Sequence, residues 1–432
     1  MRIALLDHVG YGNLGDEATL AAVLLNVRSR CPNAEVLAIT FNPEQTRNTH
    51  NIEALTIHRD CTSGPAGFTG GSPYRRRLSN HPLLWAILRF GKGLLFRWPR
   101  EFVREFRHAI RSFRALEGVD LLVVAGGGQL RDKAFGQYAF PYNIWKWVVL
   151  SRLRGARAYF VNQGAGPLKT ATGRYFLKSA LGKADYVSFR DRRSRDLLMS
   201  AGWKGESAVH PDCVYGLPAD LGGPSSRLDD SAQSVIGISP MRVYWDRDPR
   251  IYEKLIDDLG DLGASLSLQN RTLCLFSTEN PADDLPISDL AAAIFKRAPA
   301  AKLDTAKIHD LAEVWSCMRR MDFVVTCRFH GVVFAHRMGI PVLAIAHHPK
   351  VSTLMHDLGL SEFCIEVADC TPDRLTDLFA SLTARSDEIR SHMLDSAERY
   401  RLELMRQFDS LFPIQKATTN IMMRIEERAS LG

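Results

Sequence analysis

The chain has 432 residues, 46% hydrophobic and 24% charged, a composition that excludes disordered, collagen-like and miniprotein classes. Length alone predicts at least two domains, because single domains average about 150 residues. The longest apolar runs, 121–125 and 341–346 among them, are far shorter than the roughly 20 residues that cross a bilayer. The first residues do not resemble a signal peptide, so we expect a cytoplasmic protein.

The net charge of +7 is concentrated in one segment. Between residues 75 and 114 there are eleven Arg and Lys against two Glu, which leaves the rest of the chain slightly acidic. This pattern argues against nucleic-acid binding and for a single basic surface. From Leu95 to Phe113 the apolar residues lie three or four apart, with arginines between them. Two interpretations stay open: a helix that contacts an anionic membrane from the inner face, and a core-packing helix with a solvated arginine face.

Short apolar runs alternate with helix-compatible stretches along the chain. Strands are expected at 3–9, 36–41, 121–125, 158–162 and 186–189, with helices at 16–30, 172–182 and 194–201. After a break rich in Gly, Pro, Ser and Asp, strands are expected at 235–239, 272–277, 323–326 and 341–346, with helices at 249–268, near 290 and at 332–338. This alternation predicts the α/β class, with mostly parallel sheets covered on both faces.

We expect two Rossmann-like β/α domains that face a cleft. The predicted division is an N-terminal domain at 1–216 with a basic insertion at 61–114, a linker at 217–234 and a C-terminal domain at 235–432. The charged amphipathic stretch 387–412 predicts a long helix that packs across both domains.

Glycine-rich turns follow several predicted strands, where parallel sheets bind ligands. The first has the G-x-G-x-x-G spacing of a dinucleotide-binding loop, but the next strand ends in Thr40-Phe41-Asn42 and lacks the acidic residue that grips a ribose. A helix N-terminus facing an anionic ligand and a plain turn both stay open. The candidate acceptor- or anion-binding residues of these loops are Gly10, Gly12, Asn13, Gly15, Gly127 and Gly128. A third run, 163–167, is also expected to be a turn.

Cationic residues also follow predicted strands. Arg190, Arg328 and Lys350 are placed to bind a phosphate or carboxylate. His330, between Arg328 and Gly331, is the best candidate for proton transfer near neutral pH. Histidines are frequent from 330 to 356, but no acid or cysteine shares metal-ligand spacing with them, so no metal site is predicted.

In these motifs the chain resembles the polysaccharide pyruvyl transferase family. The motifs stand in order as GYGNLGDEA (10–18), GGGQL (126–130), SFRDRRS (188–194), HPDCVYGL (210–217) and RFHGVVFAHRMGIPVLAI (328–345). The resemblance implies a fold like that of GT-B glycosyltransferases. It also implies transfer of pyruvate from phosphoenolpyruvate onto two hydroxyls of a sugar, as a cyclic ketal, in a polysaccharide precursor that we expect to be lipid-linked.

The resemblance also implies roles for individual residues. His330 matches the motif histidine of the family and is expected to be the catalytic acid, with Asp16 as the second candidate, a base. Arg190, Arg328, Lys350 and Gly331 are expected to bind phosphoenolpyruvate, and the N-terminal domain is expected to bind the acceptor. No cofactor and no metal is implied, since phosphoenolpyruvate is a co-substrate.

Two other functions compete with this one. A nucleotide-sugar glycosyltransferase of the same fold commonly carries E-A-x-x-x-G-x-P, whose Glu grips ribose, but Phe334 stands at that position here. A non-catalytic peripheral membrane protein would use the basic segment alone and would leave Arg328 and His330 unexplained.

Overall fold

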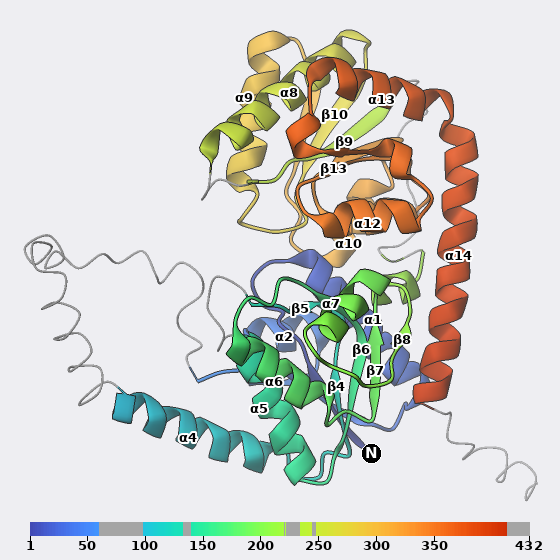
Figure 1. The fold of residues 1–432 in the computed structure, drawn as a ribbon. Helices are drawn as coiled ribbons and strands as arrows, with labels where there is room; N and C mark the ends of the chain where they lie inside the picture. The colour runs from blue at the N-terminus through green and yellow to red at the C-terminus, as the bar shows by residue number, and fades with distance from the viewer. Residues whose placement is uncertain (60–97, 133–139, 220, 222–233, 244–247, 413–432) are drawn as a thin grey trace, which may run out of the picture. The chain divides into compact units, whose positions relative to one another are not determined.

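The computed structural model describes residues 1–59, 98–132, 140–219, 221, 234–243 and 248–412 (Figure 1). The chain divides into two compact units. The first unit comprises Met1–Tyr11, Ala34–Ser188 and Ser194–Ala208, and the second comprises Gly12–Asn33, Phe189–Arg193 and Val209–Gly432. The domain boundaries that the sequence analysis places at 216 and 235 stay a prediction, and most of the predicted linker lies outside the described residues.

The sheet of the first unit is mainly parallel. Its strands are β1 (Arg2–Leu6), β2 (Glu35–Thr40), β3 (Glu53–Thr56), β4 (Leu121–Val124), β5 (Gly127–Leu130), β6 (Arg157–Ala165), β7 (Tyr186–Phe189) and β8 (Ala208–Val209). They lie in the order β3-β2-β1-β4-β6-β7-β8, with β5 beside β6. Helices of this part are α2 (Pro43–His50), α4 (Trp98–Ala115), α5 (Phe140–Leu153), α6 (Ala171–Leu181) and α7 (Arg192–Ser200). Because β1 pairs in parallel with both β2 and β4, the strand order reverses between β1 and β4.

The sheet of the second unit repeats this topology. Its strands are β9 (Val235–Ser239), β10 (Thr272–Phe276), β11 (Leu303–Ala306), β12 (Phe323–Thr326), β13 (Val342–Ala346) and β14 (Cys364–Glu366), in the order β11-β10-β9-β12-β13-β14. All its neighbouring strands pair in parallel, and the order reverses between β9 and β12.

The second unit also contains most of the described helices. They are α1 (Leu14–Arg30), α8 (Pro249–Leu268), α9 (Asp284–Arg297), α10 (Leu311–Met318), α11 (Phe329–Arg337), α12 (Pro349–Asp357), α13 (Pro372–Ala384) and α14 (Ser386–Leu411), with short 3-10 turns η4 (Cys213–Gly216), η5 (Ser361–Phe363) and η6 (Val367–Asp369). In Figure 1 helices α8, α9 and α13 lie around strands β9, β10 and β13. The α/β prediction is therefore confirmed.

Two predicted glycine turns are strands instead. Gln163 to Ala165, predicted to turn, are the last residues of β6 and pair with β5, which begins at Gly127. The side-chain Nε2 of Gln163 donates hydrogen bonds to the backbone carbonyls of Val124 and Ala125, 2.9 and 2.8 Å away. These contacts come from distant parts of the sequence, so a local pattern does not reveal them.

Helix α4 is the described part of the predicted basic segment, and residues 61–97 lie outside the described residues. Pro99 occupies its second position, where a missing N–H costs little, so the proline does not break the helix. No described helix has the length and hydropathy of a membrane span.

Helix α14 confirms the long C-terminal helix. Within the second unit, Asp409 lies 2.8 Å from Arg30 of α1, and Ser396 lies 2.8 Å from His336 of α11. The predicted packing of this helix across both domains stays a prediction.

Candidate active site

The RFHG motif lies where the strand order of the second sheet reverses. Arg328 and His330 follow β12 directly, and β12 is the neighbour of β9 at the reversal. Glu279 and Lys350 follow β10 and β13, so they emerge at the same edge of the sheet. Ligands of open α/β sheets bind at this edge, outside the carboxyl ends of the strands.

Helix α11 begins without a side-chain cap. Its N-cap residue is Arg328, which has no oxygen to accept a hydrogen bond, and no side chain in the described ranges caps the first turn. The first N–H groups of a helix carry a partial positive charge and favour an anion. This end of α11, beside His330, is therefore suited to a phosphate or carboxylate.

His330 is buried, and its imidazole is neutral at pH 7. Its pKa is lowered to about 4, mainly by burial; Asp212 acts to raise it, and Arg190 and Lys350 act to lower it. The Nε2 atom lies 3.9 Å from Asp212 and has no hydrogen-bond partner among the residues that the structure describes. A neutral, desolvated imidazole in this position can hold or release a proton once an anion binds beside it.

Two of the predicted donor-binding cations lie against one aromatic ring next to His330. The guanidinium carbon of Arg190 lies 4.1 Å from the ring centre of Phe329, and the Lys350 ammonium lies 5.9 Å from it. The Phe329 ring in turn contacts His330, with ring centres 5.2 Å apart. Arg190 is also held by Asp212, 3.3 Å away. The structure thus brings Arg190, Lys350 and His330 together.

Arg328, predicted to bind phosphoenolpyruvate, forms ion pairs with carboxylates of the protein in this structure. Its Nε donates to Asp283 over 3.0 Å, and its two terminal nitrogens form further ion pairs with Asp283 and Glu279. The Asp283 carboxylate is fully buried and also accepts a hydrogen bond from Ser277, 2.9 Å away. Arg328 therefore ties the segment after β10 to the start of α11.

The first glycine loop is hydrogen-bonded to the same segment. The Leu14 N–H donates to Thr278, and the Asn280 N–H donates to Gly12, each over 2.9 Å. Gly12 has a φ of 77°, and a Cβ there would overlap the Asn280 carbonyl, so only glycine fits. Asn13 caps α1 by accepting the N–H groups of Gly15 and Asp16, over 3.0 and 3.2 Å.

Gly15 places the start of α1 directly against His330. A Cβ on Gly15 would overlap the His330 ring around Nδ1. Asp16, the predicted base, is the next residue in the first turn of α1. Of the predicted residues in this loop, Gly15 thus lies against His330, and Gly12, Asn13 and Asp16 are its neighbours in the chain.

Replacing Gly15 with alanine is expected to displace the His330 ring and to lower turnover by at least tenfold, because small shifts of a reacting group are costly. Gly128→Ala is the control for stability, since a Cβ at that position would meet nothing within 4 Å. Circular dichroism melting measures the stability of both variants, and an assay of the activity that the sequence resemblance implies compares the turnover of Gly15→Ala with that of the wild type. Full turnover by Gly15→Ala would mean that His330 is not held by this contact.

The remaining predicted site residues have other surroundings. Gly331 packs on β12, where a Cβ would overlap the Thr326 side chain. Gly10, Gly127 and Gly128 belong to the first unit, at the carboxyl ends of β1 and β4. Gly127 and Gly128 lie in β5 rather than in a turn.

Three acidic residues of the site were missed by sequence reasoning. Asp212 lies in the HPDC motif, which could have pointed to it, whereas Glu279 and Asp283 follow β10 without any local pattern. In the part of the chain that is described, no group of three or more His, Cys, Asp and Glu side chains is arranged to hold a metal ion.

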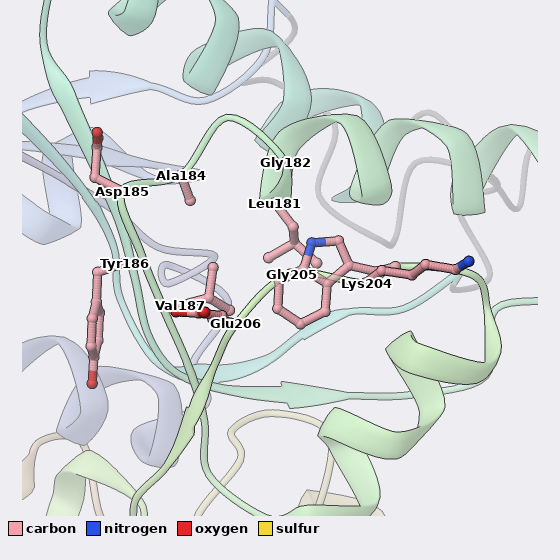
Figure 2. Close-up of a pocket in the computed structure, with 10 residues that line it drawn as sticks. Leu181, Gly182, Ala184, Asp185, Tyr186, Val187, Lys204, Gly205 and Glu206 are labelled. Carbon is pink, nitrogen blue, oxygen red and sulfur yellow. The ribbon is translucent and has the colours of Figure 1, made fainter.

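A separate hollow of about 420 Å³ lies in the first unit, near the start of β7 (Figure 2). It is lined by Leu181, Gly182, Ala184, Asp185, Tyr186, Val187 and Trp203 to Glu206. Asp185 and Tyr186 mark the amino end of the strand, opposite to the edge that binds ligands in such sheets. No function is assigned to it.

Comparison with known proteins places these observations in a family. The sequence model of the polysaccharide pyruvyl transferases matches residues 13–349. Among solved structures, Anabaena HepE in complex with UDP and glucose is 14% identical, with a TM-score of 0.57 over 95% of this chain and 100% of that one. The spinosyn rhamnosyltransferase SpnG with its aglycone is 13% identical, with a TM-score of 0.52 over 93% and 97%. The UDP-GlcNAc 2-epimerase of Methanocaldococcus jannaschii is 9% identical, with a TM-score of 0.54 over 88% and 92%. These likenesses show the fold alone, two Rossmann-like domains of the GT-B type.

Proposed function

Because the chain belongs to the polysaccharide pyruvyl transferase family, we propose that it transfers pyruvate from phosphoenolpyruvate onto two hydroxyls of a sugar, as a cyclic ketal. The observation that carries the proposal is the uncapped start of α11 between Arg190 and Lys350, beside His330. Phosphoenolpyruvate has a phosphate and a carboxylate, and these groups call for converging cations and free N–H donors.

The proposed chemistry uses three proton transfers and no cofactor. His330 gives a proton to the methylene carbon of phosphoenolpyruvate, and the neighbouring carbon becomes an oxocarbenium-like centre that a sugar hydroxyl attacks. The second hydroxyl then attacks the same carbon, and the bond to phosphate breaks with its electron pair. Of the two hydroxyl protons, one restores His330 and the other leaves with phosphate. Asp16 is the proposed base for a hydroxyl proton.

Binding of the phosphoenolpyruvate anion is what favours the protonated, acidic form of His330. Burial holds the pKa of the free imidazole at about 4, so at pH 7 it carries no extra proton. The negative charges of phosphoenolpyruvate favour the imidazolium and raise this pKa on binding. In this proposal Arg190 and Lys350 bind phosphoenolpyruvate while His330 is protonated.

A nucleotide-sugar glycosyltransferase is the alternative, since structures with this fold include UDP complexes. The residue at the position of the ribose-binding Glu is Phe334, which is fully buried and packs on Trp315 with ring centres 5.1 Å apart. A carboxylate there would be buried away from solvent, so this position favours the pyruvyl donor.

Ligand-dependent melting tests the donor. Phosphoenolpyruvate at one hundred times its Kd should stabilise the folded protein by about 2.7 kcal/mol, whereas UDP-glucose and GDP-mannose should not shift the melting temperature. Arg190→Gln should lose the shift, and Arg192→Gln, an exposed neighbour, should keep it. A shift with a nucleotide sugar and none with phosphoenolpyruvate would transfer the assignment to a glycosyltransferase.

For the acceptor we propose a lipid-linked saccharide, with helix α4 contacting the anionic inner membrane face. The outer side of α4 exposes Val103, Phe106 and Ile110, of which Phe106 is 58% accessible. Four exposed arginines flank this stripe, Arg104, Arg107, Arg111 and Arg114. On its other side, Glu105 pairs with Lys146 of α5 over 2.9 Å, which anchors the helix to the first unit. Apolar residues edged by arginine are the pattern of interfacial helices.

Liposome flotation measures this contact. Vesicles with one third phosphatidylglycerol should float the protein at low salt, with binding decreasing as salt rises, and neutral vesicles should bind it weakly. Phe106→Asp should abolish flotation, whereas Leu268→Asp, exposed on α8, should leave it unchanged. Absence of binding at every salt concentration would remove the membrane from the proposal.

A further inference from the structure

The first unit has a histidine of its own at the reversal of its sheet. His8 follows β1, and Gln129 lies in β5, just after β4. The strand order reverses between β1 and β4, so His8 occupies the place in the first sheet where Rossmann-like folds bind ligands. Nothing in the proposed donor chemistry uses His8.

The neighbours of Gln129 fix which nitrogen of His8 carries the proton. The Gln129 Nε2 donates to Asp7, Ala125 and Gly126 over 2.9, 2.9 and 2.7 Å, so its amide orientation is determined. Its Oε1 therefore faces the Nδ1 of His8, 2.5 Å away, and an oxygen at that distance requires a proton on Nδ1. The Nε2 of a neutral His8 is then a lone-pair acceptor.

That acceptor is buried and has no hydrogen-bond partner among the described residues. His8 is 6% exposed, and burial lowers its pKa to about 3, which keeps the ring neutral at pH 7. A buried acceptor without a donor is unfavourable, so such atoms are normally satisfied by a water or a ligand.

Aromatic rings connect His8 to the surface of the first unit. The ring centres of Phe140 and Phe41 lie 4.1 and 4.9 Å from that of His8, and Tyr11 lies 4.7 Å from Phe41. Tyr11 is 36% exposed. Pockets for small polar ligands combine such apolar walls with a few oriented polar groups. A pyranose matches both features, because its ring has an apolar C–H face and an edge of hydroxyl donors.

We propose that the first unit binds a pyranose of the acceptor here, with its C–H face on Tyr11 and one hydroxyl donating to Nε2 of His8. This inference rests on the proposed function for the identity of the ligand, and it adds a residue that selects for a hydroxyl at one ring position. An analogue without that hydroxyl leaves a buried acceptor unpaired, which gives strong discrimination.

Saturation-transfer NMR with methyl glucopyranoside, methyl galactopyranoside and methyl mannopyranoside tests this site without any transfer reaction. At least one glycoside should show transfer to its ring protons, weakened tenfold or more in Tyr11→Ala and in His8→Phe. Tyr175→Ala, which removes an exposed tyrosine of α6, is the matched control and should keep the signal. No transfer to any of the three glycosides, or equal loss in the control, would overturn the proposal.

Two further readouts separate this inference from the donor assignment. The nitrogen chemical shifts of His8 should show a protonated Nδ1 and a bare Nε2, and the Nε2 signal should move when the glycoside binds. The melting shift with phosphoenolpyruvate should stay intact in His8→Phe, which also shows that the variant is folded. If phosphoenolpyruvate does not shift the melting temperature of the wild type, the proposed function is rejected. If the wild type and His8→Phe bind the saccharide equally well, only the role of His8 is rejected.

Discussion

Replacing His330 with glutamine is expected to lower kcat by about 10²- to 10⁴-fold, the usual contribution of a general acid. Glutamine keeps the size and hydrogen-bonding capacity of the site but transfers no proton. Because Arg190, Lys350 and the α11 amides remain, the melting shift with phosphoenolpyruvate should persist. His356→Gln, which changes an exposed histidine of α12, is the control and should keep wild-type turnover.

The same variant should alter the pH dependence of stability. The pKa of His330 is lower in the folded protein, about 4, than its ordinary 6.5, so the unfolded chain binds more protons between these values. The wild type therefore loses stability as the pH falls below 6.5, by up to about 1.4 kcal/mol per pH unit from this group. His330→Gln should lack that part of the loss in urea titrations at pH 7 and pH 5. If His330→Gln has the same pH dependence of the free energy of unfolding and the same kcat as the wild type, His330 is not a buried, reactive group.

The sheets and the motif histidine could be predicted because their signals are local. Buried parallel strands are continuous apolar runs, so β7, β9 and β12 have the bounds that their sequences predict. His330 follows β12 and precedes a helix, which places it at a ligand-binding edge without any knowledge of its neighbours.

The partners of Arg328 could not be predicted in this way. Asp283 is separated from Arg328 by 45 residues, and nothing in the spacing of the acids after β10 distinguishes it from a solvated carboxylate. A cation at a strand end suits an anionic ligand and an internal carboxylate equally well. The tautomer of His8 likewise depends on Gln129, 121 residues away. The sequence thus shows the charge of such a residue and its place at a strand end. Whether the residue binds a ligand or forms an internal ion pair is decided by tertiary contacts.

Replacing Arg328 with methionine is expected to destabilise the second unit by about 3–5 kcal/mol, since it leaves a buried carboxylate without its cation. Asp283 is fully buried, and among the described residues Ser277 alone would remain as a side-chain hydrogen-bond donor to it. The loss should appear as a melting temperature roughly 10 °C lower. Asp283→Asn added to Arg328→Met removes the stranded charge and should recover most of the loss, because paired removal of a buried ion pair is far less costly than removal of one partner.

The double variant decides what Arg328 does. If Arg328 only joins the segment after β10 to α11, the restored protein should again show the melting shift with phosphoenolpyruvate, because the proposed anion ligands Arg190 and Lys350 remain in place. If the shift stays absent in a stable double variant, Arg328 binds phosphoenolpyruvate, as the family resemblance implies, and must then exchange a carboxylate partner for the donor. A single Arg328→Met protein within 1 kcal/mol of the wild type would show that the ion pair with Asp283 is not a buried pair in solution.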